Sequence, residues 1–275
     1  MNLDSIIASK IFTKFCLESL EKSRLSCHDP KRNMSKISFM NYGKLAKNRV
    51  PHIVAAGRSE LQKEVEKLIF FDICQKLNIT PADHVLDIGC GPGNITIPIS
   101  FICKKMVAID HPNTIKKLSI RYSDHDSFEL IGGNFLNFDI ENKFNKIIIY
   151  SVIQYLSNIK EVLAFILKAM ALVEPGGSIL IGDIPNSTKK ARFLKSDYGK
   201  IFVVEWNKNI ENNPLEFDIK QDDDNLQVEL NDKTILWLVG NIREKGFNAE
   251  LISQPSSLPF GHTREDILIT HPEYC

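Results

Sequence analysis

Residues 84–94 read His84-Val85-Leu86-Asp87-Ile88-Gly89-Cys90-Gly91-Pro92-Gly93-Asn94, an apolar run followed by three glycines at alternate positions. A short apolar run that ends in a glycine-rich turn is typical of a buried strand. Glycines let a ligand approach the backbone where a Cβ atom would collide, and they adopt φ > 0 in a turn. The helix that follows offers unpaired N–H groups to an anionic group at its N-terminus. The stretch therefore predicts a strand, a ligand-binding turn and a helix.

From His84 onward, strand-sized apolar runs alternate with helical patterns. Strands are predicted at 84–88, 106–109, 128–131, 146–153, 178–184, 249–253 and 266–270. Repeated strand–helix–strand units predict a parallel sheet with helices on both faces, an α/β fold. The polar region 186–232 has no place in this repeat, so we expect an insertion there, part helix and part hairpin.

Composition describes an ordinary globular chain of 275 residues, in which 34 Lys and Arg balance 34 Asp and Glu. This balance argues against a broad nucleic-acid or membrane-surface footprint. No apolar run approaches the ~18–20 residues of a membrane span, and no basic region precedes an apolar block at the N-terminus. The six cysteines form no C-x-x-C pair, which favours reduced thiols in the cytoplasm over a disulfide framework or a zinc site.

Two kinds of ligand compete for the glycine turn. A dinucleotide fingerprint, G-x-G-x-x-G, needs its third glycine where this chain has Asn94. The acidic Asp87 before the first glycine sits poorly beside a pyrophosphate and suits a ligand with positive charge, which a carboxylate stabilises. An NAD-binding oxidoreductase is therefore the weaker alternative.

The segment VLDIGCGPGN resembles the first motif of class I S-adenosylmethionine (SAM)-dependent methyltransferases, in which an acidic residue precedes G-x-G-x-G. Four later segments also resemble motifs of that family: Asp110 after the second strand, Gly133-Asn134-Phe135 after the third, 150–156 at the fourth, and 172–177 before the fifth. The resemblance covers about residues 61–270, which is most of the chain.

The resemblance implies a Rossmann-like seven-stranded sheet of order 3-2-1-4-5-7-6, with strand seven antiparallel. It implies a methyltransferase domain at 57–275, with 186–232 as a cap, and an N-terminal helical extension at 1–56 that covers the active site. Ligands of such sheets bind beyond the carboxyl ends of the parallel strands. The loops after strands five and six are therefore expected at the rim of the site.

The resemblance also implies a set of cofactor-binding residues. Asp110 would bind the ribose hydroxyls, and Asn134 would lie near adenine, although the family usually has Gly-Asp there. The expected cofactor-binding residues are Asp87, Gly89, Cys90, Gly91, Gly93, Asp110, His111, Asn134, Phe135, Ser151 and Gln154. Simpler structural roles remain open for several of them: a tight turn for the glycines, a helix cap for Asp110, and a packed thiol for Cys90.

Candidates for catalysis and substrate binding come from the rim. An imidazole titrates near ~6.5, which suits a general base for a hydroxyl acceptor, so His262 leads and His52 follows. Tyr155 is a third catalytic candidate. The expected substrate-binding residues are Asp183, Lys189, Arg192 and Arg264, whose cations suit a phosphate-bearing substrate if they are not merely a solvated helix face.

The function implied is methyl transfer from SAM, with S-adenosylhomocysteine (SAH) as product, to a small molecule. The chain's appearance resembles bacterial enzymes of surface-polysaccharide or specialised biosynthesis, so O-methylation of a sugar, nucleotide-sugar or phosphate-bearing precursor is expected. We expect no metal, no nucleic acid and no membrane as partner, and a homodimer stays open. A catalytically silent SAM-binding partner of another methyltransferase is the second alternative.

Overall fold

The computed structural model describes residues 39–41, 43–44, 51–122, 127–213 and 228–273. Most of the helical extension expected at 1–56 lies outside these residues, as do Cys16, Cys27 and Cys275. The described chain forms a seven-stranded sheet of order β3-β2-β1-β4-β5-β7-β6, which confirms the predicted order. The strands are β1 (His84–Ile88), β2 (Lys105–Asp110), β3 (Phe128–Gly132), β4 (Phe144–Tyr150), β5 (Val173–Pro185), β6 (Asn248–Ser253) and β7 (Arg264–Thr270).

Strand directions also follow the prediction. The pairs β1–β2, β1–β4, β2–β3 and β4–β5 are parallel, and β7 runs antiparallel to both β5 and β6. The described helices are α3 (His52–Ala55), η1 (Glu60–Gln62), α4 (Lys63–Leu77), α5 (Thr96–Ser100), α6 (Pro112–Arg121), η2 (Phe135–Asn137), η3 (Ile153–Tyr155), α7 (Ile159–Met170), α8 (Ser187–Lys195), α9 (Asp197–Asn212) and α10 (Asp232–Arg243).

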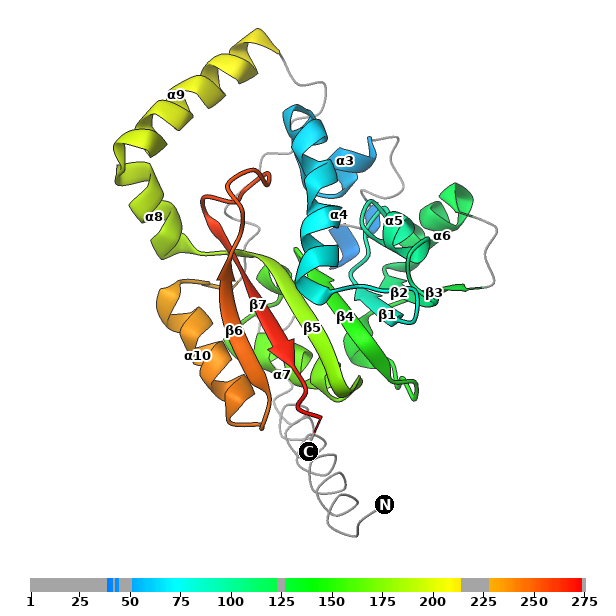
Figure 1. Cartoon of the computed structure of the whole chain (residues 1–275). Helices are drawn as coiled ribbons and strands as arrows, with labels where there is room; N and C mark the ends of the chain where they lie inside the picture. The colour runs from blue at the N-terminus through cyan, green and yellow to red at the C-terminus, as the bar shows by residue number, and fades with distance from the viewer. Residues whose placement is uncertain (1–38, 42, 45–50, 123–126, 214–227, 274–275) are drawn as a thin grey trace.

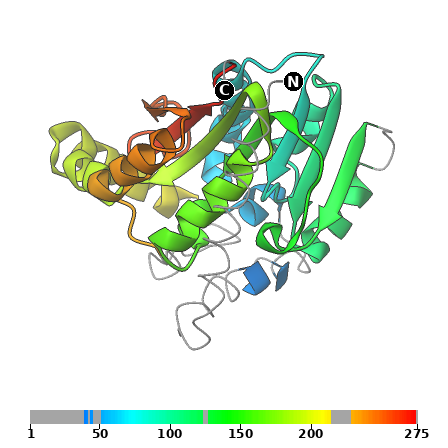
Figure 2. The same cartoon turned by 90° about the horizontal axis from the view of Figure 1, so that it is seen from below.

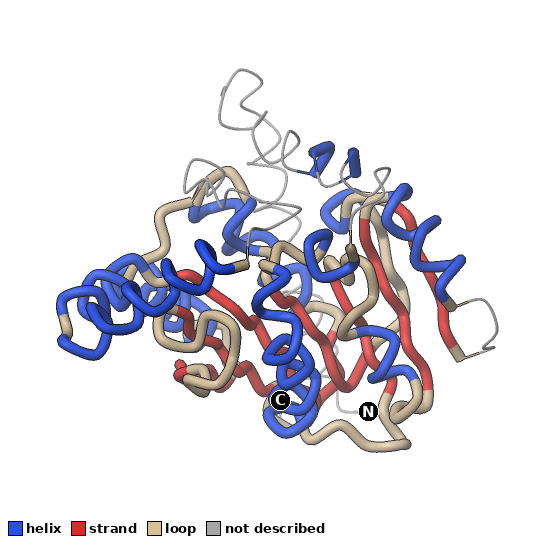
Figure 3. Tube along the Cα trace, turned by 90° about the horizontal axis from the view of Figure 1, so that it is seen from above, coloured by secondary structure: helices blue, strands red, loops and turns tan. Residues whose placement is uncertain are grey.

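Helices cover both faces of the sheet, as Figures 1 and 3 show. Consecutive strand residues point to opposite faces, and β4 illustrates this with three successive isoleucines. Ile147 and Ile149 join the apolar cluster that includes Ile166 of α7 and the inner residues of α10. Ile148 joins the cluster on the other face, with Ile73 of α4. Figure 2 shows α7 and α10 beside one another beneath the sheet.

Two strand boundaries differ from the prediction by three residues or more. The fourth strand was expected to reach residue 153 but ends at Tyr150, because Ser151 takes φ 59° and leaves the extended conformation. The fifth strand was expected to begin at 178 but begins at Val173 and pairs with Phe144 through an irregular register. The early end of β4 turns the chain into η3 at the carboxyl edge of the sheet.

The region 186–232 contains α8 and α9, which project from the body of the molecule (upper left in Figure 1). Asn186 caps α8 by accepting from two backbone N–H groups, 3.0 Å each. Residues 214–227 of this region lie outside the described residues, and its described part forms no hairpin. The expected cap over the site is not seen in the described part, because α8 and α9 extend away from the sheet.

The sequence before β1 leads into the sheet through a well-capped helix. Ser59 accepts from the Leu61 N–H at 3.3 Å, and Gln62 accepts from the Ser59 N–H at 3.0 Å. This capping box starts η1, which runs directly into α4. No helix among the described residues is both long and apolar enough to cross a bilayer.

Candidate functional site

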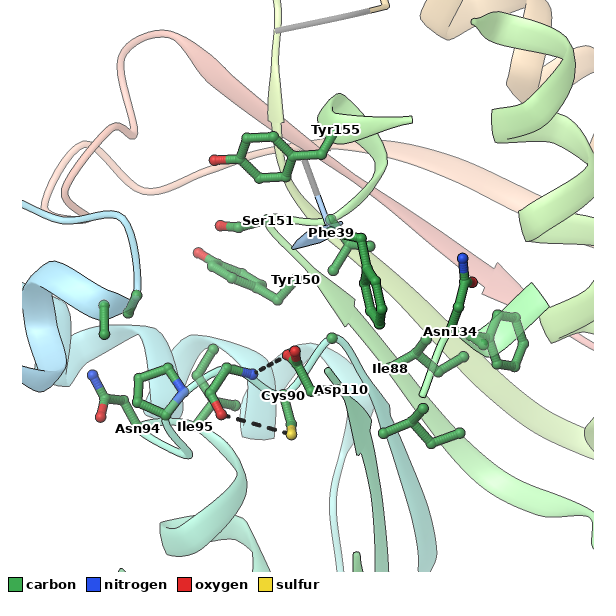
Figure 4. Close-up of a pocket in the computed structure, with 18 of the residues that line it drawn as sticks. Phe39, Ile88, Cys90, Asn94, Ile95, Asp110, Asn134, Tyr150, Ser151 and Tyr155 are labelled. Carbon is green, nitrogen blue, oxygen red and sulfur yellow. Dashed lines mark hydrogen bonds between the residues drawn. The ribbon is translucent and has the colours of Figure 1, made fainter. Parts of the chain in front are cut away.

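A cavity of about 190 Å³ lies at the carboxyl edge of β1, β2 and β4. Figure 4 shows it lined from the strand ends, from η3 and from the segment before β1. Its lining residues are Phe39, Ala55, Ala56, Arg58, Glu66, Ile69, Ile88, Gly89, Cys90, Gly91, Pro92, Asn94, Ile95, Ile109, Asp110, Gly133, Asn134, Phe135, Leu136, Tyr150, Ser151, Val152, Tyr155, Leu156, Glu161 and Phe165. The cavity therefore occupies the crevice expected for a ligand of an open α/β sheet.

The turn after β1 forms the floor of the cavity together with Asp110. The Gly91 N–H donates to the Asp110 carboxylate at 2.8 Å, the bond drawn in Figure 4. The His111 N–H donates to the other carboxylate oxygen. Burial raises the pKa of Asp110, and these two backbone bonds oppose that rise. Both Gly91 and Asp110 line the cavity, as the sequence analysis expected of cofactor-binding residues.

Gly91 has φ 54°, and a Cβ atom added there would meet nothing in the chain within 4 Å. Gly93 has φ 86°, and a Cβ atom there would lie 2.3 Å from Leu118. Gly93 is therefore required by packing against α6. Gly91 keeps the backbone bare on the side where a ligand would approach.

Asp87 and Cys90 lie close to the turn but have packing partners of their own. Asp87 is 3% exposed and accepts from the Thr96 hydroxyl at 2.6 Å. Burial raises its pKa to about 7. Cys90 lines the cavity, and burial raises the pKa of its thiol. A thiol held in its neutral form is a poor nucleophile, so the environment of Cys90 suits packing.

The far end of the cavity is built after β3. Asn134 caps η2 by accepting from the Leu136 N–H at 3.0 Å, and it lines the cavity in Figure 4. Phe135 packs edge-on against Phe165 of α7, with ring centroids 4.9 Å apart. This end offers an amide and two aromatic rings, which suits a flat heterocycle.

The remaining cofactor candidates divide. Ser151 lines the cavity at the end of β4. His111 and Gln154 are buried but are not among the described lining residues. His111 caps α6 through Nδ1, which accepts from the Asn113 N–H at 3.1 Å, and its ring lies 4.8 Å from that of Phe39. His111 thus supports the cavity wall from behind.

Of the three catalytic candidates, the structure brings only Tyr155 to the described cavity wall, on the same side as Tyr150 and Ser151 in Figure 4. His262 stacks on Phe193 of α8 instead, with ring centroids 4.7 Å apart. Burial and Lys189 lower its pKa. His52 is exposed at the start of α3, and burial and Arg121 lower its pKa. The positions of His262 and His52 do not support a role as general base.

The four substrate candidates have partners within the chain. Arg192 pairs with Asp232, and Lys189 donates to the Arg264 carbonyl at 2.7 Å and lies 3.7 Å from Glu265. None of the four lines the cavity as described. The expected phosphate site is therefore not assembled by these side chains, because neighbouring carboxylates already neutralise the cations.

Arg264 and Asp183 belong to a buried network beside the cavity. The Arg264 Nε lies 3.6 Å from one Asp183 carboxylate oxygen, and Arg58 donates to the other at 2.9 Å. Arg58 also donates to the Ser151 hydroxyl at 2.9 Å. Asp183 thus meets two guanidinium groups without being a described lining residue itself.

Several lining residues were not predicted from the sequence, chiefly Arg58, Glu66, Glu161 and Phe39. Arg58 is 6% exposed, and its Nε has no hydrogen-bond partner among the described residues. Glu66 accepts from Asn94 at 2.8 Å, and Glu161 accepts from the Ser157 N–H at 2.7 Å. The sequence signal near Arg58 is the capping box that begins at Ser59. It indicates where the helix begins but not what the Arg58 side chain contacts.

The lining residues fit a SAM-like ligand in three respects. The bare backbone at Gly91 admits a close ligand, Asp110 brings a carboxylate to the cavity wall, and the buried Nε of Arg58, which has no described partner, suits an anionic group. Among the described residues, no cluster of three His, Cys, Asp or Glu side chains could hold a metal ion.

Known proteins share this fold and part of this sequence. N-methyltransferase NodS from Bradyrhizobium japonicum, solved with SAH, superposes with a TM-score of 0.56 at 14% identity, over 86% of this chain and 98% of that one. Phosphoethanolamine N-methyltransferase 1 from Haemonchus contortus gives a TM-score of 0.62 at 13% identity, over 87% of this chain and 49% of that one. At these identities the likeness shows the fold.

In sequence, the chain is 28% identical over 135 residues to an rRNA adenine N-6-methyltransferase of Bacteroides fragilis. The alignment covers 49% of this chain and 50% of that relative, so it spans about half the relative's length. The family model for Nodulation protein S (NodS) matches residues 58–205, from Arg58 through most of α9. This match covers more than half of the chain, which therefore belongs to the NodS family of class I SAM-dependent methyltransferases.

Proposed function

We propose that the chain transfers a methyl group from SAM to a small-molecule acceptor that enters beside Tyr155. The observation that carries this proposal is the cavity whose wall combines the glycine turn with Asp110 at the carboxyl edge of the sheet. Family membership and the SAH-bound relative of the same fold support SAM as the cofactor.

Different lining residues would bind different parts of SAM. Asp110 would accept from the ribose hydroxyls, and Asn134 with Phe135 would hold the adenine. Arg58, with an orphaned buried Nε, would bind the methionine carboxylate through a charge-assisted hydrogen bond. Bound SAM supplies an electrophilic methyl group on a sulfonium. The chain's own contribution is then to bind SAM and the acceptor, to orient the acceptor and to exclude water. Orientation of this kind can lower the activation barrier by up to ~7–11 kcal/mol.

For the acceptor, the sequence analysis favours a hydroxyl of a sugar, nucleotide-sugar or phosphate-bearing precursor of bacterial polysaccharide or specialised biosynthesis. The pairing of Lys189, Arg192 and Arg264 within the chain gives no support to the phosphate. A sugar hydroxyl would have to lose its proton during the transfer. Tyr155 is the candidate at the cavity wall whose hydroxyl could relay that proton.

An amine is the second candidate acceptor. Glu66 and Glu161 bring carboxylates to the cavity wall, and a carboxylate attracts an alkylammonium group before it loses its proton. Two relatives of the same fold are named N-methyltransferases, which supports this candidate. A neutral amine is also a better nucleophile than a hydroxyl and needs less help from a base.

The test is a methyl-transfer assay that follows SAH formation with the full-length chain. Acceptors would be amino sugars, the matching N-acetylated sugars, simple sugars, and a short RNA as an additional arm because one relative acts on rRNA. SAH formed with amino sugars but not with their N-acetylated forms would favour the amine. SAH formed equally with both would favour the hydroxyl, and turnover with RNA alone would overturn the small-molecule proposal.

A further inference from the structure

Asp183 occupies an unusual place near the end of β5. Its side chain is 2% exposed, and its backbone has φ 59°, a left-handed conformation that residues other than glycine rarely adopt. Its backbone N–H donates to the Asp266 carboxylate at 2.9 Å. The strained residue is therefore held in place by a bond from the neighbouring strand β7.

The Asp183 carboxylate gathers groups from two other parts of the chain. Arg58, 125 residues earlier, donates to Oδ2 at 2.9 Å, and the Ser151 hydroxyl donates to the same oxygen. Ser151 has φ 59° as well, so two strained residues are joined by one hydrogen bond. Strain of this kind clusters at functional sites, where the surrounding structure holds it in place.

The partners of Asp183 reach the cavity, although Asp183 is not one of its described lining residues. Arg58 and Ser151 both line it. The Arg58 guanidinium also lies over the Phe260 ring, 5.1 Å from its centroid. Its Nη2 donates to Asp183 and Ser151, and its Nη1 donates to the Ala56 carbonyl at 3.3 Å. Its Nε is a buried donor without a described partner.

From this geometry we propose that Asp183 is a positioning residue for cofactor binding rather than a substrate ligand. Its carboxylate fixes the Arg58 guanidinium and the Ser151 hydroxyl at the wall of the cavity, so that Arg58 presents its Nε–H to an anionic group of the bound ligand. This inference rests on the proposed function, because SAM is the ligand whose carboxylate would use that donor.

The rival explanation is a buried ion pair that only stabilises the fold. The two explanations predict different SAM affinities when the Asp183 charge is removed. The comparison needs a second variant that loses a similar amount of stability. Asp183→Asn removes the charge but keeps the shape, and Asn tolerates a left-handed backbone better than other residues. Asp83→Asn is a matched control, because Asp83 is also a buried carboxylate, 5% exposed. Asp83 accepts from the Asn145 amide at 2.8 Å and directly precedes β1, at the end of that strand away from the cavity.

The experiment measures the melting temperature and the SAM dissociation constant of the full-length wild type and of both variants. We expect both variants to melt at lower temperature. Asp183→Asn should weaken SAM binding at least tenfold, whereas Asp83→Asn should change it less than twofold. Unchanged SAM affinity in Asp183→Asn, or equal weakening in both variants, would overturn the positioning role.

A double-mutant cycle with Arg58→Met tests whether Asp183 acts through Arg58. We expect Asp183→Asn to change SAM affinity less than twofold in the Arg58→Met background, because the group that it positions is already gone. A full tenfold loss in that background would contradict the proposal. The double variant also removes both charges of the pair, so it is the one to use if Asp183→Asn alone does not fold.

These outcomes separate the inference from the proposed function. If wild type and Asp183→Asn bind SAM equally well, the positioning role of Asp183 is wrong, and the proposed methyltransferase function is unaffected. A wild type that binds no SAM overturns both.

Discussion

Asp87 is a buried carboxyl beside the glycine turn, and burial raises its pKa from 3.8 to about 7. A carboxyl whose pKa is higher in the folded than in the unfolded chain keeps its proton on folding. The folded state is then favoured at low pH, and stability falls as the pH rises from about 4 to about 7. Each unit of pH in this window costs up to about 1.4 kcal/mol.

We expect Asp87→Asn to remove this part of the pH dependence, since an amide does not titrate and can still accept from the Thr96 hydroxyl. The check is the free energy of unfolding in urea at pH 5 and pH 7.5 for wild type and variant. The difference in the free energy of unfolding between wild type and variant should be smaller at pH 7.5 than at pH 5. Parallel losses in the two proteins would show that Asp87 does not titrate in this range.

Tyr155 is the catalytic candidate that the structure brings to the cavity. We predict that Tyr155→Phe lowers kcat at least tenfold with a hydroxyl acceptor, because proton transfer contributes about 10²–10⁴-fold where it is needed. SAM affinity should stay the same, since the ring remains. With an amine acceptor the loss should be smaller. Equal kcat values for wild type and variant with a hydroxyl acceptor would remove Tyr155 from the chemistry.

At the scale of the element, the strand–turn–helix from β1 to α5 combines Gly93, which packs against α6, with Gly91, which lines the cavity. Gly91 and Gly246 both have positive φ, 54° and 85°, and a Cβ atom at either would meet nothing within 4 Å. Gly91 lines the cavity, whereas Gly246 follows α10. Both positions therefore have a left-handed backbone, and only one of them lies at the cavity.

We predict that Gly91→Ala and Gly246→Ala each lower stability by about 1–2 kcal/mol, the cost of a left-handed residue with a side chain. Only Gly91→Ala should weaken SAM binding, at least tenfold, because its methyl group would stand where the ligand approaches. Urea unfolding and SAM titration of both variants check this. Equal SAM affinities in the two would show that the turn does not approach the cofactor.

Helix boundaries and helix contacts were predictable to different degrees. The capping box at Ser59 and Gln62 can be read from the sequence, because it depends only on residues three apart. The rim position of the loop with His262 also followed from topology. The direction of the His262 side chain did not, since it is decided by stacking on Phe193 of a helix that projects from the sheet.

At the scale of the whole molecule, the order and direction of all seven strands were predictable. Buried β-branched runs between glycine turns indicate parallel strands, and the resemblance to class I methyltransferases implies the strand order that is observed. The contribution of Arg58 was not predictable, because it meets Ser151 and Asp183 across 93 and 125 residues of chain. A single arginine before a helix carries no periodic signal, so its role depends on how the sheet folds.

The account depends on the claim that the cavity at this sheet edge binds SAM. Titration calorimetry of SAM into the full-length chain tests it most directly. We predict saturable binding at one site per chain, weakened about tenfold or more by Asp110→Ala because hydrogen bonds to a charged group are lost, and no binding of NAD. An absence of saturable heat with SAM, or binding of NAD in its place, would contradict the account.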